Sequence, residues 1–324
     1  MSSFVEFEKI IAKEINNLNL VVPPEKLYQP IEYVLSMGGK RLRPVLTLMA
    51  CNMFEPNFEK ALPAAIALEM FHNFTLLHDD IMDNASLRRN MPTVHKKWDN
   101  NTAILSGDAM MIKAYGYIIE SNLPNKNQIL SFFNKTALKV CEGQQYDMDF
   151  ETRDDVSEKE YLLMIRLKTA ELLAACLKIG ALCSNTSEKN VNLLYESGID
   201  MGLAFQLQDD YLDVFGDTEV FGKKVGGDIL CNKKTFLLIK AFELANEKEK
   251  SNLFEELKKI NFVPEEKIAA VTKTFLNLGI KELTKNKIKE LTDSANKKIL
   301  QLEVEKEKKS ELLHLINKLS DRLK

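Results

Sequence analysis

Residues 162–179 read LLMIRLKTAELLAACLKI, and the apolar side chains in this stretch return every three or four positions. Such spacing places them along one face of an α-helix, whereas a half-buried strand would alternate apolar and polar residues, a pattern that is not sustained in this sequence. Of the nine prolines only Pro264 lies beyond Pro124, so the rest of the chain is open to long uninterrupted helices. The sequence predicts an all-α fold.

The composition also favours a helical globular protein. The chain has 324 residues, 45% of them hydrophobic, with only 13 glycines and 9 prolines, which argues against a disordered, collagenous or all-β protein. Its formal net charge of -3 gives no reason to expect a nucleic-acid partner. We expect one domain, residues 1–324, with residues 281–324 as a polar C-terminal helical segment packed on the remainder.

The cysteines and the amino terminus bear on location. The five cysteines include no C-x-x-C pair and resemble small core residues of a reducing compartment. The first residues lack the basic and apolar regions of a signal peptide, and no apolar stretch approaches the roughly 20 residues that a bilayer requires. We therefore expect a cytoplasmic protein without a membrane span.

One acidic motif occurs twice, as Asp-Asp-Ile-Met-Asp at residues 79–83 and as Asp-Asp-Tyr-Leu-Asp at residues 209–213. On a helix each copy directs three carboxylates into one wedge of space, and the apolar neighbours indicate semi-buried helices. Two charges about 4 Å apart repel by roughly 4 kcal/mol at an effective dielectric constant of 20, so such groups protonate, pair or bind metal. Two copies favour metal. The candidate ligands are Asp79, Asp80, Asp83, Asp209, Asp210 and Asp213.

Carboxylate ligands without cysteine or paired histidine suit Mg²⁺, with Mn²⁺ as a substitute, and exclude a typical zinc site. Because Mg²⁺ keeps water and phosphate oxygens as ligands, the sequence predicts phosphate on the substrate. Three basic segments are suited to phosphate. The first follows a glycine pair, the second follows the first acidic motif, and the third lies in a glycine-rich stretch. Their cations are Lys40, Arg41 and Arg43, then Arg88 and Arg89, and lastly Lys223.

Five motifs occur in a fixed order. They are Gly39-Lys40-x-x-Arg43, the first acidic motif with Arg88-Arg89, Lys168-Thr169, Phe205-Gln206 with the second acidic motif, and Gly222-Lys223-x-x-Gly226-x-Asp228-Ile229. Together they resemble the motifs of the trans-isoprenyl diphosphate synthases, over about residues 25–240. The resemblance implies a single-domain, all-α isoprenoid synthase fold, a helical bundle around a deep central cavity that pairs as a homodimer.

The resemblance also implies the reaction. It is a head-to-tail condensation of isopentenyl diphosphate with an allylic partner (dimethylallyl, geranyl or farnesyl diphosphate), assisted by three Mg²⁺ ions. The implied catalytic residues are Asp79, Asp80, Asp83, Asp209, Lys168 and Lys223. The residues implied to bind the allylic diphosphate are Arg88, Lys168, Thr169, Gln206 and Lys223. Those implied for isopentenyl diphosphate are Lys40, Arg43, His72 and Arg89.

One position departs from the family pattern, and it affects Lys233. Asn232 stands where the family commonly has glycine. Asparagine tolerates a left-handed backbone better than most residues, so the turn can survive. Lys233 is therefore a candidate phosphate ligand of lower rank than Lys223.

Product length in the family depends on the fourth and fifth residues before the first aspartate, here Thr75 and Phe74. A single aromatic at the fifth position resembles synthases that make geranylgeranyl diphosphate, with a farnesyl or longer product as the alternative. An ideal helix turns Phe74 about 140° away from Asp79, so Phe71 and Met70 are further candidates for the cavity floor.

Two other classes of protein were weighed. A class I terpene cyclase usually replaces the second acidic motif and does not need the loop of residues 38–44, and both are present here. A catalytically silent synthase subunit typically loses one acidic motif, and this chain keeps both. The sequence therefore favours an active synthase.

Overall fold

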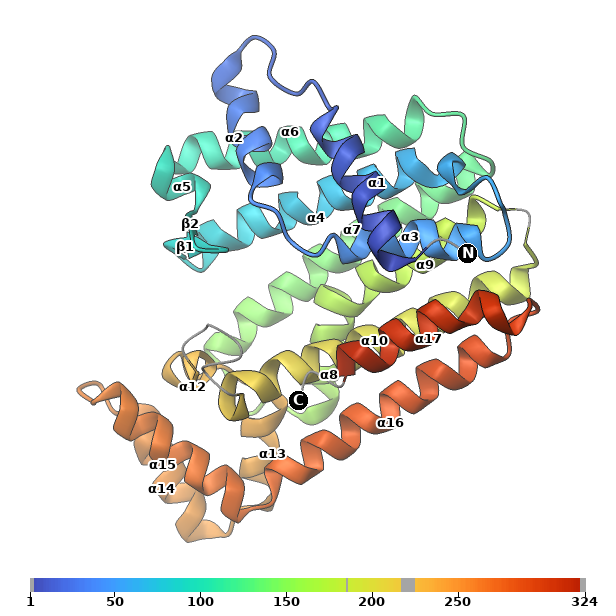
Figure 1. The fold of residues 1–324 in the computed structure, drawn as a ribbon. Coiled ribbons are helices and arrows are strands. Elements are labelled where there is room, and N and C mark those ends of the chain that lie inside the picture. The colour runs from blue at the N-terminus through green and yellow to red at the C-terminus, as the bar shows by residue number, and fades with distance from the viewer. Residues whose placement is uncertain (1–2, 185, 217–224, 321–324) are drawn as a thin grey trace. The chain divides into compact units, whose positions relative to one another are not determined.

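Helices dominate the fold, as predicted (Figure 1). The computed structural model describes residues 3–184, 186–216 and 225–320. The chain divides into two compact units. Unit 1 comprises Met1–Lys135, Ala175–Tyr195 and Leu302–Glu311, and unit 2 comprises Thr136–Ala174, Glu196–Gln301 and Leu312–Lys324.

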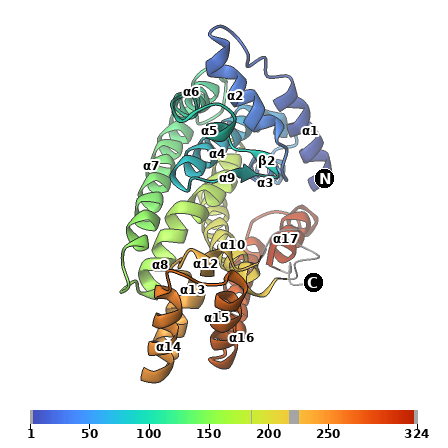
Figure 2. The ribbon, with the colours of Figure 1, turned by 90° about the vertical axis from the view of Figure 1, so that its left-hand side faces the viewer.

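Unit 1 contains the amino-terminal helices and a short hairpin. Its elements are α1 (Phe4–Asn16), α2 (Glu25–Ser36), α3 (Leu42–Asn52), the 3₁₀ turn η1 (Phe58–Ala61), α4 (Leu62–Met82), β1 (Leu87–Arg88), β2 (Met91–Pro92), α5 (Val94–Lys97) and α6 (Asn100–Ile119). Helix α1 begins at a capping box formed by Ser3 and Glu6. Helix α4 is apolar around most of its circumference, and α6 packs along it (Figure 2). The first acidic motif forms the carboxyl-terminal end of α4.

Unit 2 is built on the carboxyl-terminal helices. Its own elements are α8 (Glu158–Ile165), the π-helical turn η2 (Arg166–Ala170), α12 (Gly227–Leu230), α13 (Phe236–Leu244), α14 (Glu247–Lys258), α15 (Pro264–Asn277) and α16 (Ile280–Leu300). The helices with residues in both units are α7 (Lys126–Glu151), α9 (Glu171–Leu182), α10 (Glu188–Phe215) and α17 (Lys306–Ser320). Leu207, Phe236 and Ile288 share one buried apolar cluster, which joins α10, α13 and α16. This cluster holds the helix that carries the second acidic motif.

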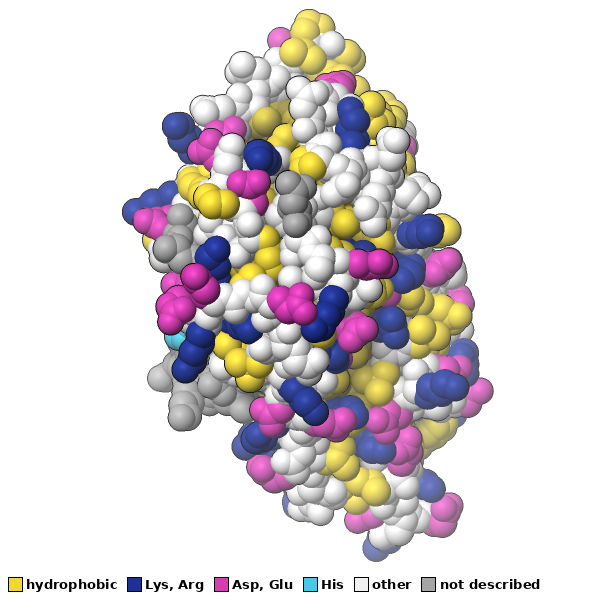
Figure 3. Space-filling model, turned by 90° about the vertical axis from the view of Figure 1, so that its right-hand side faces the viewer, with side chains coloured by type: hydrophobic (Ala, Val, Ile, Leu, Met, Phe, Trp, Pro, Cys, Tyr) yellow, Lys and Arg dark blue, Asp and Glu magenta, His cyan; other side chains and the backbone are white. Residues whose placement is uncertain are grey.

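Of the expected carboxyl-terminal segment, the structure describes residues up to 320, and these form most of α16 together with α17. Within unit 2 the hydroxyl of Ser197 on α10 donates to the Ala295 carbonyl of α16 at 3.1 Å. On the face that Figure 3 presents, basic and acidic side chains alternate, as the nearly balanced charge of the sequence suggests. No helix within the described ranges is long and apolar enough to cross a membrane.

Candidate active site

The first acidic motif ends helix α4. Asp80 is buried, only 4% exposed, and both of its carboxylate oxygens accept a hydrogen bond from Arg88 Nε at 2.9 Å. Asp79 is half-buried, and Asp83, the residue that follows the helix, is exposed. The middle carboxylate is therefore neutralised by an arginine, while the outer two are more accessible to a ligand from solvent.

A tight hairpin sends two adjacent arginines to different partners. Arg89 and Asn90 connect β1 and β2 with φ angles of 53° and 63°, as a type I′ turn requires. Arg88 in β1 reaches the acidic motif, whereas the Arg89 guanidinium donates to the Gly38 carbonyl before α3. A Cβ atom on Gly39 would lie 2.7 Å from the guanidinium carbon of Arg89, so this approach requires glycine. The hairpin thereby joins the acidic motif to the glycine loop.

The loop of residues 38–44 was expected to offer three cations to an anion, and this was wrong for Arg41. Its side chain is buried and forms an ion pair with Glu69 at 2.5 Å, because the left-handed backbone at Arg41, with φ at 44°, turns it inward. Arg43 Nη1 instead lies 2.9 Å from His72 Nε2, and Lys40 is exposed. Arg41 is thus a structural residue.

His72 lies among several positive charges. Burial lowers the pKa of His72 well below its ordinary value, and four nearby arginines lower it further. These are Arg43, Arg89, Arg88 and Arg41. A neutral His72 accepts from Arg43 at Nε2 and so carries its proton on Nδ1. Arginines gathered around a neutral imidazole suit a polyanion such as a diphosphate. We call Asp79, Asp80 and Asp83, with Arg43, His72, Arg88 and Arg89, the first acidic site.

The second acidic motif lies on α10, and its middle aspartate is again buried. Asp210 is 3% exposed and accepts hydrogen bonds from the Tyr161 hydroxyl and, at 3.0 Å, from Gln206 Nε2. Gln206 in turn accepts from the Thr169 hydroxyl at 2.9 Å. Burial raises the pKa of Asp210, and the charge of Lys233 partly opposes this. Asp210 is therefore held by neutral donors.

Lys168 and Thr169 lie in the π-helical turn η2 between α8 and α9. Such turns insert one residue into a helix and are frequent at functional sites. Lys168 Nζ donates to Asp147 of α7 at 2.6 Å. A Cβ atom on Gly143 of α7 would lie 2.3 Å from the Lys168 backbone nitrogen, so glycine lets the turn approach α7.

A further carboxylate, Asp228 at the start of α12, faces the second motif. Its backbone N–H donates to Asp213 Oδ2 at 2.9 Å. Burial raises the pKa of Asp228 to about 7, and the charge of Asp210 adds to this effect. We call Asp209, Asp210, Asp213 and Asp228, with Asp147, Lys168, Thr169, Gln206 and Lys233, the second acidic site.

The donor chemistry of both sites suits a hard cation. Every acidic group in them offers carboxylate oxygen, and at the second site burial, reinforced by the charges of neighbouring aspartates, raises the pKa of Asp228 to about 7. Within the described residues no three acidic, histidine or cysteine side chains already form a ready ligand group. Mg²⁺ commonly completes its shell with water and substrate phosphate, so the residues fit this ion.

The remaining predicted residues divide as follows. Lys223 lies in residues 217–224, outside the described residues. Phe74 is 8% exposed, and its ring lies 4.8 Å from the His78 ring and 5.5 Å from that of Phe71. The Thr75 hydroxyl donates to the backbone carbonyl of His72 at 2.8 Å. Phe74 and Phe71 thus belong to one aromatic group in unit 1.

Sequence reasoning missed Asp147 of the second acidic site, and it missed Tyr161, which donates to Asp210 of that site. Tyr161 lies 49 positions before its partner Asp210, and a tyrosine in an apolar stretch reads as core. Asp147 lies 21 positions before Lys168 and stands in no acidic cluster with a repeat elsewhere. The one available signal is the spacing from Gly143 to Asp147, a helical turn that places a small residue and a carboxylate on one face.

Known proteins share this fold and these motifs. A crystal structure of a geranylgeranyl pyrophosphate synthase matches with a TM-score of 0.95 at 46% identity, over 99% of each chain. The geranylgeranyl diphosphate synthase of Methanosarcina mazei is 44% identical over 231 residues, 71% of each chain. A geranylgeranyl pyrophosphate synthase from Corynebacterium glutamicum, complexed with isoprenyl diphosphate and magnesium, matches with a TM-score of 0.88 at 26% identity, over 99% of this chain and 100% of that one.

The helical fold and the paired acidic motifs therefore define a class, the isoprenyl diphosphate synthases. The polyprenyl synthetase family model matches residues 24–275, and the chain belongs to this family. The resemblance drawn from the motifs is confirmed. The protein is an enzyme, a prenyltransferase.

Proposed function

We propose that this prenyltransferase makes geranylgeranyl diphosphate in the cytoplasm, from isopentenyl diphosphate and allylic diphosphates. The observation that carries the proposal is the repeated motif, whose middle aspartate is buried in both copies while the outer carboxylates are more exposed and lie beside basic groups. Dimethylallyl, geranyl and farnesyl diphosphates are the proposed allylic substrates. The names of the similar proteins support the twenty-carbon product.

The proposed cofactor is a group of three Mg²⁺ ions, for which Mn²⁺ can substitute. Asp79, Asp83, Asp209 and Asp213 would hold them, and Asp80 and Asp210 would brace the motifs from within. When bound, the metal supplies positive charge that stabilises the diphosphate leaving group. The magnesium and isoprenyl diphosphate in the Corynebacterium relative support this assignment.

The chain's own residues perform the remaining tasks. Lys168 and Lys233 meet the charge that develops on the allylic diphosphate as its C–O bond ionises, which is the kind of electrostatic stabilisation that contributes most to catalysis. Arg43 and Arg89 orient isopentenyl diphosphate, whose double bond attacks the allylic cation. The released proton then passes to the departing diphosphate. The apolar faces of the helices exclude water, which would otherwise quench the cation.

Product length is proposed to depend on the aromatic group of α4. Phe71 is 1% exposed, and its ring lies 5.5 Å from that of Phe74 and 5.4 Å from that of Phe133 on α7. A wall of three contacting rings resists displacement better than a single side chain does. This supports Phe74 with Phe71 behind it as the limit to chain growth.

We also propose a homodimer formed through α6. Leu105, Ile112 and Ile119 recur at intervals of seven on this helix and are 60%, 68% and 52% exposed. A row of exposed apolar side chains along one helix face is typical of a helix that packs against a partner. Light scattering after gel filtration should give twice the chain mass for the wild type, and Ile112→Glu should give the monomer mass.

The proposed reaction is tested by incubating the purified protein with Mg²⁺, labelled isopentenyl diphosphate and each allylic diphosphate in turn. We expect a twenty-carbon product from all three, and none after chelation of the metal. A fifteen- or twenty-five-carbon product would retain the synthase and correct the product. No elongation with any allylic partner would contradict the proposal and favour the silent-subunit hypothesis.

A further inference from the structure

The turn between α12 and α13 contains an asparagine with two tertiary hydrogen bonds. Asn232 has a left-handed backbone, with φ at 53°. Its side-chain oxygen accepts from Lys267 Nζ of α15 at 2.8 Å, and its side-chain nitrogen donates to the Leu257 carbonyl of α14 at 2.9 Å. A glycine would provide the same backbone conformation without either bond. Asn232 therefore ties the turn to two other helices.

Lys267 is unusual for a lysine because it is 1% exposed. Its ammonium group lies 4.4 Å above the centre of the Phe262 ring and donates to Asn232. A buried ammonium is costly unless polar or aromatic partners compensate it. An apolar side chain of the same length would fill this space without the desolvation cost of a buried charge. We therefore expect the charge itself to have a function.

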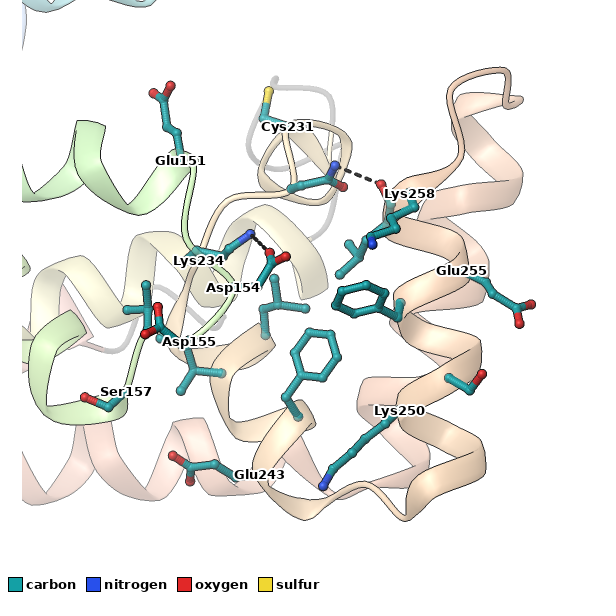
Figure 4. A pocket seen from close by; sticks show the side chains of 18 of the residues that line it. Glu151, Asp154, Asp155, Ser157, Cys231, Lys234, Glu243, Lys250, Glu255 and Lys258 are labelled. Atoms are coloured by element: carbon teal, nitrogen blue, oxygen red, sulfur yellow. Dashed lines mark hydrogen bonds and ion pairs between the residues drawn. The ribbon is translucent and has the colours of Figure 1, made fainter.

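On its other side the turn borders open space rather than packed side chains. A groove of about 1290 Å³ runs beside Cys231 and Lys234 and along α14 (Figure 4). The ion pair there joins Lys234 to Asp154 at 3.1 Å, and Asp154 is 66% exposed, so it adds little restraint. The two side-chain bonds of Asn232 are what tie this turn to α14 and α15.

The residue that follows Asn232 faces the second acidic site. The backbone N–H of Lys233 donates to the Asp228 carbonyl at 2.9 Å, and its own carbonyl accepts from Thr235 N–H at 2.9 Å. The charge of Lys233 lowers the pKa of both Asp210 and Asp228 against the effect of burial. The positive charge of Lys233 thus influences the carboxylates of that site, and the position of its backbone determines where this charge lies.

We propose that Lys267 is a positioning residue for substrate binding, which acts through Asn232 to fix the turn that presents Lys233 to the allylic diphosphate. This inference rests on the proposed function. Lys267 touches no reacting group, and its contribution passes through one hydrogen bond to Asn232 and one peptide bond to Lys233. The asparagine in place of the family's glycine is then part of a pair with Lys267.

The test compares three variants of the full chain with the wild type: Lys267→Met, Asn232→Gly, and both together. Methionine keeps most of the apolar length of lysine, and glycine keeps the left-handed backbone. We expect each single change to raise the KM for farnesyl diphosphate by about five- to tenfold, because a charge-assisted hydrogen bond is lost, while the KM for isopentenyl diphosphate changes less than about twofold. The double variant should be no worse than the more severe single variant, since both changes break one link.

Lys273→Met is the matched control, an exposed lysine on the same helix, and should leave both KM values unchanged. Equal increases in the two KM values would indicate a merely structural role and overturn the proposal. The proposal would also be overturned if the increase in the KM for farnesyl diphosphate in the double variant equalled the product of the two single increases. Should Lys267→Met not fold, Asn232→Gly decides by the same split between the two KM values. A wild type without turnover would contradict the proposed function. An active wild type whose variants keep unchanged KM values would instead contradict the positioning role of Lys267.

Discussion

Asp80 and Asp210 hold the same place in two copies of one motif, and they are 4% and 3% exposed, yet their partners differ in charge. Asp80 is paired with the guanidinium of Arg88, eight positions further along the chain. Asp210 receives neutral donors, the Tyr161 hydroxyl and the Gln206 amide. A neutral donor stabilises a carboxylate without cancelling its charge, so the two sites differ in net charge although their motifs match.

Because the partners of Asp80 and Asp210 differ in charge, we expect the stability of the two sites to depend on metal to different extents. At the first acidic site Arg88 balances the buried charge of Asp80, so we expect folding of this site to depend less on a bound ion. At the second acidic site burial raises the pKa of Asp228, and the negative charges of Asp210 and Asp213 raise it further. Binding of a cation therefore contributes more to folding at the second site, because it relieves repulsion already present.

The largest expected effect comes from the outer ligands, where the two sites should behave alike. Asp79→Ala and Asp209→Ala each remove a proposed Mg²⁺ ligand, so each should lower kcat/KM by about 10²–10³-fold. The measurement is steady-state kinetics with farnesyl diphosphate. Asp293→Ala on α16, an exposed aspartate paired with Lys289, is the control. Activity within about tenfold of the wild type for either variant would remove that residue from the metal site.

Removal of the internal partners should separate the sites. Arg88→Met leaves the buried charge of Asp80 without its cation and should reduce the free energy of unfolding by about 2 kcal/mol. Tyr161→Phe removes one of two neutral donors to Asp210 and should cost about 1 kcal/mol. Urea unfolding in metal-free buffer measures both. The reverse order would mean that charge compensation is not what distinguishes the two aspartates.

The pH dependence of stability should sharpen the same contrast. The folded pKa of Asp228 is about 7 against an ordinary value of 3.8, so between these values the folded chain binds more protons than the unfolded chain. Stability contributed by the protonated group is complete below about 4 and is lost as the pH rises to about 7. We expect the metal-free Tm to fall by about 5 °C across this range from Asp228 alone.

The check for this pH effect is calorimetry of Asp228→Asn, which should flatten the profile, beside Asp80→Asn, which should keep it. Added Mg²⁺ should raise the Tm of the wild type more at pH 8 than at pH 5. A profile of Asp228→Asn that overlays the wild type would place the titration elsewhere.

The smallest expected effect concerns product length, and it involves only α4, the helix that carries the first acidic motif. Phe74 precedes the first motif by five residues, whereas Ala204 has the corresponding place before the second. Phe74→Ala should shift the main product to twenty-five carbons, with kcat/KM changed less than about threefold, because the ring blocks growth without contacting the diphosphate. Phe254→Leu on α14 is the control. Chromatography of the hydrolysed products decides, and an unchanged distribution would move the limit to Phe71.

Local patterns in the sequence predicted part of this arrangement well. Helical periodicity indicated the all-α fold because spacing of apolar residues is a property of neighbouring positions. The acidic motifs were found because both carry their carboxylates within five residues. His72 and Arg43 were both assigned to the site, and the structure brings them to 2.9 Å.

What escaped the sequence depends on distant partners. Arg41 and Arg43 are the same residue type two positions apart, and the buried Glu69, 28 residues beyond Arg41, pairs with Arg41 alone of the two. Tyr161 has an even more distant partner in Asp210. The β1–β2 hairpin has no run of alternating residues, since each strand is two residues long. Side chains that compensate a buried charge leave no periodic signal.

The π-helical turn at residues 166–170 also constrains how this chain can vary in length. One extra residue rotates all preceding helical positions by about 100° relative to those that follow. Deletion of a single residue there would let an ordinary α-helix run on, but Lys168 and Thr169 would then turn away from Asp147 and Gln206. In α8 and α9 we therefore expect a deletion to be tolerated only together with an insertion that restores the helical phase. The same deletion in an exposed loop should have little effect.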